Sequence, residues 1–178
     1  MTALFRFFRR LEKCLDIKIS FKEIFMETQE LYREILNEHN INPSHKTEMA
    51  DATISLNGVN PSCGDNITLN LKVEDGKIVD GSFTGSGCAV SQASCDMMLD
   101  LVIGKTVDEA NKLNDVFMGM IRGESSEEDM EQLDEAAALQ DISKMPARVK
   151  CAVLGWRTMK EMFESNSKCA TCSNPNCH

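Results

Sequence analysis

The chain has 178 residues, a formal net charge of -9, and 42% hydrophobic residues. This length fits one domain with its own core, and the composition is ordinary for a soluble globular protein. The acidic balance argues against nucleic acid as a ligand, because phosphate backbones are bound by clustered lysine and arginine. No apolar run approaches the ~18 residues that a membrane span requires.

Cysteine is the unusual component, since the chain contains eight. An even number would permit disulfides in a secreted protein, but residues 1–20 lack the apolar region and cleavage site of a secretory signal. We expect these residues to be an N-terminal extension; an arginine-containing organellar transit peptide is the alternative. A cytoplasmic protein is therefore expected, with thiols available for metal or sulfur chemistry.

The next segment predicts one helix and a meander of three strands. Over residues 21–39, apolar side chains recur at helical spacing opposite a series of glutamates. Strict alternation then predicts strands over 53–58, 67–73 and 78–84. The Asp-Gly pair within residues 74–77 is a strong hairpin signal, so the last two strands should be neighbours.

Helices are expected after the sheet. One should span 89–103 and end at Gly104, and another should begin after Thr106, which forms a capping box with Glu109. A last helix should run from Pro146 to residue 163 without a break. The element order predicts an α+β fold, a three-stranded antiparallel sheet packed on one side by several α-helices.

The regions outside these elements define the expected organisation. Residues 123–144 are strongly acidic, and we expect an insert that is mainly a solvated face with a short helix inside it. Residues 21–164 should form the domain, followed by a cysteine-rich tail over 165–178. A partner-docking role for the acidic insert is the alternative.

Three short segments carry the thiols that could form a site. The turn Asn60-Pro-Ser-Cys63-Gly64-Asp65 places a thiol and a carboxylate two residues apart, at the end of the predicted sheet. Cys88 should stand at a helix N-terminus, where unpaired N–H groups favour a thiolate, and Cys151 in the first turns of the last helix. Their spacing matches no zinc finger, and a lone cysteine is commonly a buried apolar residue. Spacing alone therefore does not establish a site.

Together these segments resemble the three cysteine motifs of the IscU/NifU-type iron–sulfur cluster assembly proteins. The matching residues are 60–65, 85–94 and 146–152, and the resemblance spans about residues 21–164. The chain resembles the SufU type in particular, because its acidic insert falls between the last two motifs. In addition, Lys150 stands where IscU proteins have a histidine.

The resemblance implies a metal site and a partner. Zinc would be bound by Cys63, Asp65, Cys88 and Cys151. Cys63 would accept persulfide sulfur from a SufS-type cysteine desulfurase, a histidine of which would replace Cys63 on the zinc. Arg148 would assist, and with Lys150 it could offset the negative charge of the site. Alternatively, Cys63, Cys88 and Cys151 would bind an iron–sulfur cluster as it is assembled and passed to a downstream scaffold or to apoproteins.

Three interpretations stay open. The protein is a zinc-dependent sulfur carrier, a scaffold for iron–sulfur cluster assembly, or a structural zinc domain. Thiolates suit the first two equally. An aspartate ligand exposed at a surface turn would argue against the third, because closed structural sites favour cysteine and histidine.

The other cysteines and histidines are expected to have simpler roles. Cys95 should be part of the core, whereas His39 and His45 should be exposed to solvent. The tail could bind a second metal or form a redox pair through Cys169, Cys172, Cys177 and His178. Cys14 lies in the N-terminal extension.

Overall fold

The computed structural model describes the backbone of residues 21–171 and the side chains of residues 30–126 and 128–165. The chain divides into two units, Met1–Tyr32 and Arg33–His178. Helix α2 (Phe21–Ile41) confirms the predicted helix. The expected extension, with Cys14, and the tail residues Cys172, Cys177 and His178 lie outside the described residues, as does the side chain of Cys169.

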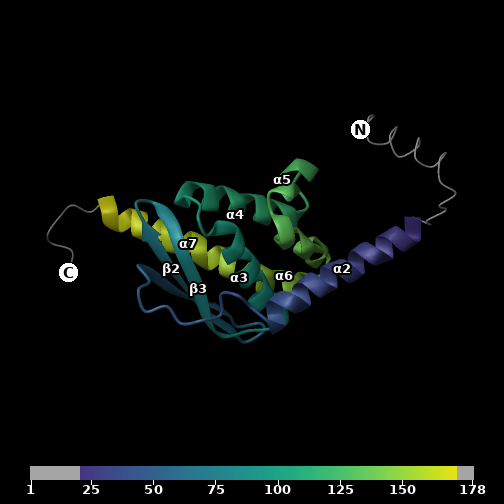
Figure 1. Cartoon of the computed structure of the whole chain (residues 1–178), viewed down its shortest axis with the longest axis horizontal. Helices are drawn as coiled ribbons and strands as arrows, with labels where there is room; N and C mark the ends of the chain where they lie inside the picture. The colour runs from purple at the N-terminus through teal and green to yellow at the C-terminus, as the bar shows by residue number, and fades with distance from the viewer. Residues whose placement is uncertain (1–20, 172–178) are drawn as a thin grey trace. The chain divides into compact units, whose positions relative to one another are not determined.

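The sheet has three antiparallel strands in the order β1-β2-β3 (Figure 1). They are β1 (Ile54–Asn60), β2 (Asp65–Glu74) and β3 (Lys77–Ser86). The β2–β3 turn has φ angles of 50° at Asp75 and 76° at Gly76, as the Asp-Gly signal predicts. The predicted meander is confirmed.

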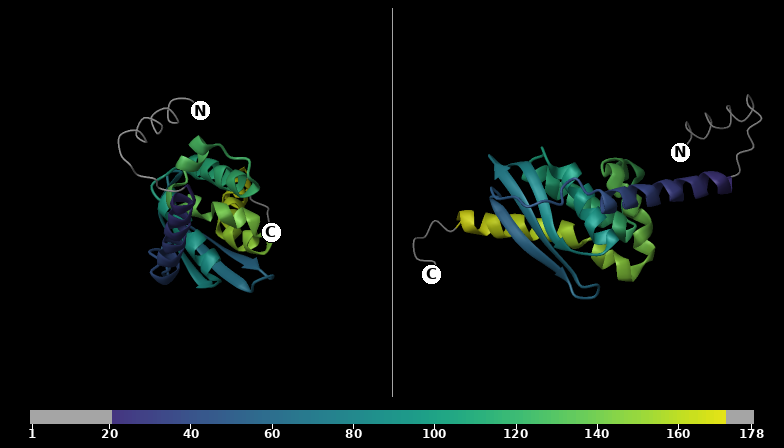
Figure 2. Two further views of the ribbon diagram at one scale, coloured as in Figure 1. Left: turned by 90° about the vertical axis from the view of Figure 1, so that its right-hand side faces the viewer. Right: turned by 60° about the horizontal axis from the view of Figure 1, so that its bottom comes forward.

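Helices cover one face of the sheet (Figure 2). The longer ones are α3 (Ala89–Val102), α4 (Val107–Arg122) and α7 (Leu154–Thr171). Glycines permit close contact with them, because a Cβ at Gly58 would collide with Thr158 of α7 and one at Gly81 would lie 2.7 Å from Leu99 of α3. The predicted α+β fold is confirmed.

Helices α3, α4 and α7 meet around the buried Trp156. Its indole ring stacks on Phe117 with centroids 4.2 Å apart, and both side chains are fully buried. The indole N–H donates to Ser94 Oγ at 3.2 Å, and this hydroxyl donates to the carbonyl of Ala152 at 2.6 Å. Burial of each large apolar side chain contributes ~1.5–3 kcal/mol, so this group firmly fixes the start of α7 on α3.

The acidic insert is more ordered than a solvated charge run. It contains α5 (Glu127–Glu131) and the 3₁₀-helix η1 (Asp134–Lys144). Leu133, Ala136 and Leu139 are fully buried, while most of the acidic side chains between them are exposed. The insert therefore contributes one face to the core. Helix α4 ends where the insert starts, and its own first turn has the predicted capping box of Thr106 and Glu109.

The prediction of one unbroken last helix is wrong. The structure has α6 (Pro146–Ala152) and α7, with Val153 between them at φ -86° and ψ -3°. Gly155, just after the break, lies so close to Cys95 that a Cβ there would be 2.5 Å from Cys95 Sγ. The interruption allows α7 to pack tightly on α3 while α6 presents Cys151 to the end of the sheet.

The prediction of solvent-exposed histidines is wrong for His39, whereas His45 is partly exposed. His39 is 9% exposed, and its ring nitrogens lie 2.7 Å from Asp96 Oδ2 and 2.7 Å from Glu135 Oε2. His45 lies 2.8 Å from Asp100, and its backbone N–H donates to Asp96 Oδ1 at 2.8 Å. A fully buried carboxylate such as Asp96 requires these partners, because an unpaired buried charge is very costly.

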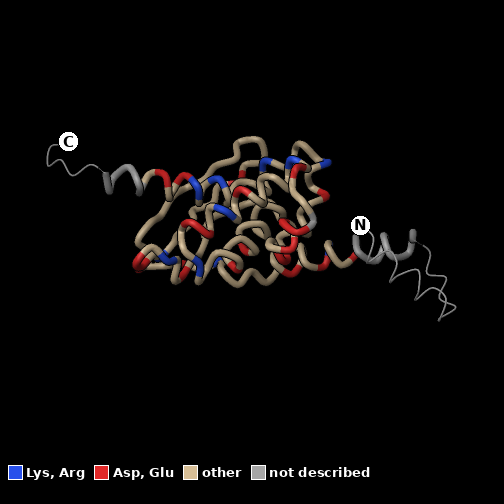
Figure 3. Tube along the Cα trace, turned by 90° about the horizontal axis from the view of Figure 1, so that it is seen from above, with Lys and Arg blue, Asp and Glu red and all other residues tan. Residues whose placement is uncertain are grey.

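Charges of both signs are spread over the described trace. Figure 3 shows lysine and arginine positions scattered among acidic ones, without a continuous basic stripe along that trace. No helix within residues 21–171 combines the length and the apolar character that a membrane crossing requires.

We predict that His39→Gln weakens the fold most at mildly acidic pH. Burial lowers the pKa of His39, but the hydrogen bonds and charges of Asp96 and Glu135 outweigh it, so the pKa lies above its ordinary value of 6.5. The stabilisation is fully present below pH 6.5, the unfolded-state value, and is lost as pH rises through the folded-state pKa. Urea unfolding at pH 6 should show a loss of about 2 kcal/mol, and a smaller loss at pH 9.

Lys144→Gln is the control, because Lys144 and Asp141 form an exposed ion pair of a kind worth ~0.5 kcal/mol. A loss for His39→Gln that is equal at both pH values would contradict the charged bridge.

Candidate functional site

The turn between β1 and β2 forms the outer wall of the site. The carbonyl of Asn60 accepts the N–H groups of Cys63 at 3.2 Å and Gly64 at 3.0 Å. Gly64 has a φ of 73°, a left-handed conformation that glycine adopts without strain. The tight turn leaves Cys63 exposed and starts β2 at Asp65.

Asp65 is buried, which corrects the expectation of an exposed aspartate. It is 1% exposed; Oδ1 accepts the Cys88 N–H at 2.7 Å, and Oδ2 accepts the Asn60 amide at 3.1 Å. Burial alone would raise the pKa of Asp65, but the Cys88 N–H and the donors Cys151, Asn60 and Ser91 lower it below its ordinary value. The carboxylate is therefore held ionised at the base of the site. Because Asp65 is buried, its exposure is no longer an argument against the interpretation of the protein as a structural zinc domain.

Cys151 reaches the same place from α6. Its Sγ lies 3.1 Å from Cys63 Sγ and accepts the Asn60 amide at 3.3 Å, and the residue is 1% exposed. Burial raises the pKa of the Cys151 thiol, and the neighbouring Cys63, Asp65 and Cys88 raise it further. A thiol in this position would lose its proton readily only when a cation shares the site.

Cys88 stands at the N-cap of α3, as predicted, and is half-buried. Its carbonyl accepts the backbone N–H of Gln92 at 3.1 Å and the Ser91 hydroxyl at 3.0 Å. The preceding Gly87 has no room for a side chain, because a Cβ there would collide with Ser91 Oγ and lie 3.6 Å from Asp65 Oδ1. Cys88 is thereby fixed directly above the Asp65 carboxylate.

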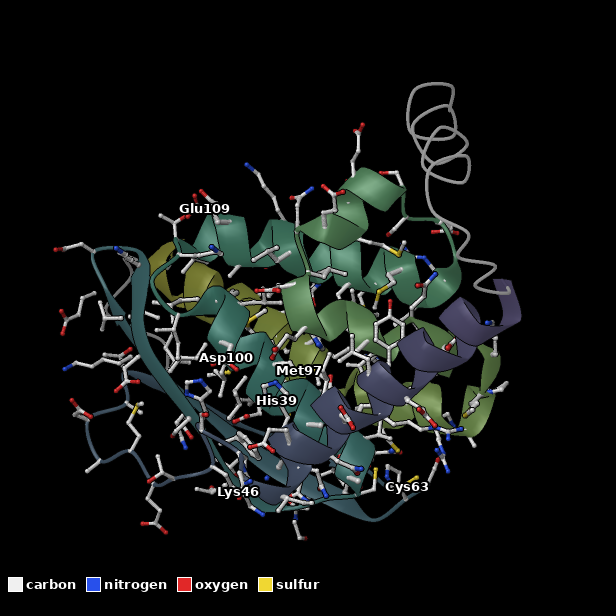
Figure 4. All side chains as sticks on the ribbon, turned by 45° about the vertical axis from the view of Figure 1, so that its right-hand side comes forward. His39, Lys46, Cys63, Met97, Asp100 and Glu109 are labelled. Atoms are coloured by element: carbon white, nitrogen blue, oxygen red, sulfur yellow. The ribbon has the colours of Figure 1, made fainter. Side chains whose placement is uncertain are left out.

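The four predicted ligand residues thus come from three distant segments to one end of the sheet. Donor atoms of Cys63, Asp65 and Cys151 all lie within 4.8 Å of one another. The sulfur of Cys88 is not part of this group of three, although it lies near enough to Cys151 to help raise the pKa of that thiol. In Figure 4, Cys63 lies at the edge of the fold, well apart from His39, Met97 and Asp100.

This donor set fits a thiophilic metal. Zinc accepts thiolates at ~2.3 Å and carboxylate oxygens at ~2.0–2.2 Å, and atoms this close together can share one ion. Iron–sulfur clusters are also held by cysteine thiolates, so the residues fit either group.

One basic side chain, that of Lys150, lies beside the turn with the exposed thiol, and Arg148 is on the same helix. Lys150 donates to Ser62 Oγ at 3.4 Å, one residue before Cys63, while Arg148 is exposed in the first turn of α6.

Cys95 is fully buried against Gly155, and burial raises its pKa to about 12. The expectation that Cys95 belongs to the core is confirmed.

A second cluster, His39, Asp96 and Asp100, also has ligand atoms within 4.8 Å of one another. The polar atoms of His39 and Asp96 already have hydrogen-bond partners in the protein. His39 bridges Asp96 and Glu135, and Asp96 Oδ2 also accepts the Ser44 N–H at 3.1 Å. We interpret this cluster as a structural ion network. His39 follows Ile35 by four residues and Leu36 by three, a spacing that could have signalled its burial.

Comparison with known proteins identifies the family. Residues 31–160 match the NifU-like N-terminal domain. The chain is 41% identical over 138 residues to the iron–sulfur cluster assembly scaffold protein IscU of Thermotoga maritima, covering 78% of this chain and 96% of that protein. It is 36% identical over 132 residues to the zinc-dependent sulfurtransferase SufU of Bacillus subtilis, covering 74% and 88%.

A solved structure supports the same family. A candidate iron–sulfur cluster assembly scaffold protein for the SUF system, from Fervidobacterium islandicum, is similar with a TM-score of 0.66 and 32% identity, over 73% of this chain and 94% of that one. The chain belongs to the NifU-like N-terminal domain family of iron–sulfur cluster assembly proteins. The resemblance seen in the sequence is confirmed, and the relatives carry both IscU and SufU names.

We predict that the thiols of the metal-free, reduced protein differ in reactivity. Under native conditions iodoacetamide should modify the exposed Cys63 at least about tenfold faster than the buried Cys151, because only an accessible thiolate reacts. Peptide mass mapping over time measures both rates. In denaturant the two rates should converge, and equal rates in the native protein would contradict the arrangement described above.

Proposed function

We propose that the protein is a zinc-dependent sulfur carrier of iron–sulfur cluster assembly, and that Cys63 is its sulfur acceptor. The observation that carries this proposal is the unequal exposure of one cluster of ligands. Cys63 is exposed, whereas Asp65 and Cys151, within 4.8 Å of it, are each 1% exposed. A partner can therefore reach Cys63 while Cys151 remains covered and Cys88 is half-buried.

The remaining residues have distinct roles in this proposal. Asp65, Cys88 and Cys151 hold the metal, and zinc when bound keeps the thiols as thiolates. Cys63 reacts. Arg148 and Lys150 lie on the solvent side, where their charges would favour the thiolate form of Cys63 and offset the negative ligand set.

The proposed transfer balances without an added oxidant or reductant. The donor is the persulfide of a SufS-type cysteine desulfurase. The Cys63 thiolate attacks its outer sulfur, so a sulfur–sulfur bond forms on Cys63 while the bond in the donor breaks, and the donor cysteine leaves as a thiolate. Cys63 then carries the persulfide to a downstream scaffold or apoprotein in the cytoplasm.

We predict that Cys63→Ala abolishes this transfer. Wild-type protein as purified should contain about one zinc ion per chain, and mixing it with a SufS-type desulfurase and cysteine should add the mass of one sulfur atom to the Cys63 peptide. The same mixture should form alanine faster than the desulfurase alone. For Cys63→Ala, both effects should disappear.

Cys95→Ala is the matched control, because Cys95 is buried in the core away from the turn. It should cost ~1 kcal/mol of stability and retain sulfur transfer. If Cys63→Ala still accelerated the desulfurase and accepted sulfur normally, the carrier proposal would be wrong. Zinc without transfer in the wild type would favour the structural interpretation.

The second candidate function is that of a scaffold on which an iron–sulfur cluster is assembled. The observation that favours it is the scaffold name of relatives such as the Thermotoga protein. Protein purified without oxygen should then contain iron and sulfide and show a charge-transfer absorption, and Cys88→Ser or Cys151→Ser should lose both. Zinc alone under these conditions would favour the carrier.

A further inference from the structure

Asn60 connects the ligands to the turn that carries Cys63. It ends β1 and pairs in register with Asp65, the first residue of β2, and it is 5% exposed. Its side-chain Oδ1 accepts the backbone N–H of Ser62 at 3.2 Å. The amide nitrogen Nδ2 of the same carboxamide group is thereby turned towards the interior of the site.

This amide group has two partners, and both are proposed metal ligands. Nδ2 lies 3.1 Å from Asp65 Oδ2 and 3.3 Å from Cys151 Sγ. An amide nitrogen carries two hydrogens, so it can donate to both at once. One side chain therefore orients a carboxylate and a thiol that lie 86 residues apart (151 − 65).

The thiol of Cys63 lacks such support. Within the described part of the chain, no N–H group donates to Cys63 Sγ; its donor is the Cys151 thiol at 3.1 Å, a weak donor that is lost once both sulfurs are thiolates on a metal. Cys88 likewise has no N–H donor to its sulfur among these residues, but it is half-buried and fixed at the start of α3. An N–H donor withdraws electron density from a thiolate and fixes its direction, so an unsupported, exposed thiolate reacts more readily.

We propose that Asn60 is a positioning residue that selects which ligand reacts. By holding Asp65 and Cys151 on the metal, it leaves Cys63 as the one thiolate that is free to leave and accept sulfur. This inference rests on the proposed function, since it concerns the ligands of that metal.

The chemistry of asparagine suits this role. Serine at position 60 could still accept the Ser62 N–H, because short hydroxyl side chains close turns in the same way, but it would not reach Asp65 or Cys151. Aspartate would retain the acceptor and the volume of Asn60, yet it would present a carboxylate to the Asp65 carboxylate instead of a donor.

The test compares Asn60→Ser with Asn57→Ser. Asn57 lies on the same strand and donates from Nδ2 to Asn66 Oδ1 at 2.7 Å and to Thr68 Oγ1 at 3.0 Å, so it matches Asn60 in bonding but lies outside the site. Zinc-loaded proteins are treated with limiting N-ethylmaleimide and mapped by peptide mass. Zinc affinity is measured by competition with a chromophoric chelator, and melting of the metal-free proteins reports on the fold.

Wild type and Asn57→Ser should be modified at Cys63 at least about tenfold faster than at Cys151. In Asn60→Ser, modification of Cys151 relative to Cys63 should rise about threefold or more although Cys151 stays buried, because its thiolate loses the amide donor. Zinc affinity should fall about 10–100-fold, as expected on loss of an outer hydrogen bond to metal ligands. A purely structural role would lower the melting temperature without redirecting the modification.

If a folded Asn60→Ser protein keeps both the Cys63 selectivity and the wild-type affinity, Asn60 only closes the turn and the inference is wrong. Should Asn60→Ser fail to fold, Asn60→Asp takes its place with the same expected loss of selectivity. Wild-type protein that binds no zinc, or that accepts sulfur elsewhere than at Cys63, would contradict the proposed function itself. Zinc content and the site of sulfur transfer are therefore measured on the wild type before the variants are compared.

Discussion

The buried carboxylate of Asp65 is the constraint on which the site depends. A charged group that is 1% exposed must be compensated by hydrogen bonds, and two of its donors come from different elements. Oδ1 accepts from the start of α3 through Cys88, and Oδ2 accepts from the end of β1 through Asn60. The ionised carboxylate therefore joins the sheet to α3 even before a metal is considered, and it holds the backbone of Cys88 beside the other predicted ligands.

The surrounding backbone makes this arrangement asymmetric. Gly64, in its left-handed conformation, turns Cys63 outward, while β2 carries Asp65 inward from the very next residue. The break at Val153 lets α6 present Cys151 from the buried side, although α7 must lie flat against α3 and β1. One thiol thus faces solvent and another faces the core, at a separation of only 3.1 Å between Cys63 and Cys151. A protein that exchanges sulfur with a partner needs this combination of access and retention.

Local patterns in the sequence predicted the features that depend on neighbouring residues. Alternation predicted the strands, Asp75-Gly76 predicted the hairpin turn, and Thr106 with Glu109 predicted the start of α4. Features set by distant partners were missed. His39 was expected to be exposed because its partners Asp96 and Glu135 lie 57 and 96 residues away, although its spacing from Ile35 and Leu36 pointed inward.

Asp65 was expected to be exposed for a similar reason. A carboxylate beside a Pro- and Gly-containing turn ordinarily faces water, and nothing in the local sequence reveals that the amide of Asn60 and the N–H of Cys88 replace that water. The break at Val153 follows from the packing of Gly155 on Cys95, which is 60 residues distant in the sequence (155 − 95). The resemblance to a family predicted the ligand residues, whereas only the structure distinguishes the exposed Cys63 from the buried Asp65 and Cys151.

The chain connectivity gives a separate reason why Cys63 would be the mobile ligand in the proposed function. Asn60 pairs directly with Asp65, so the ends of the turn stay joined by β1–β2 hydrogen bonds whether or not Cys63 binds a metal. Releasing Cys63 would free only the few residues between them. Releasing Cys151 would instead remove a link between segments that lie 88 residues apart, because Cys151 joins α6 to the turn that carries Cys63. Because a cross-link that closes a long loop removes more entropy from the unfolded chain, the ligands that join distant segments contribute more to stability than one within a turn. The ligand that costs least to release is therefore the one that solvent and a partner can reach.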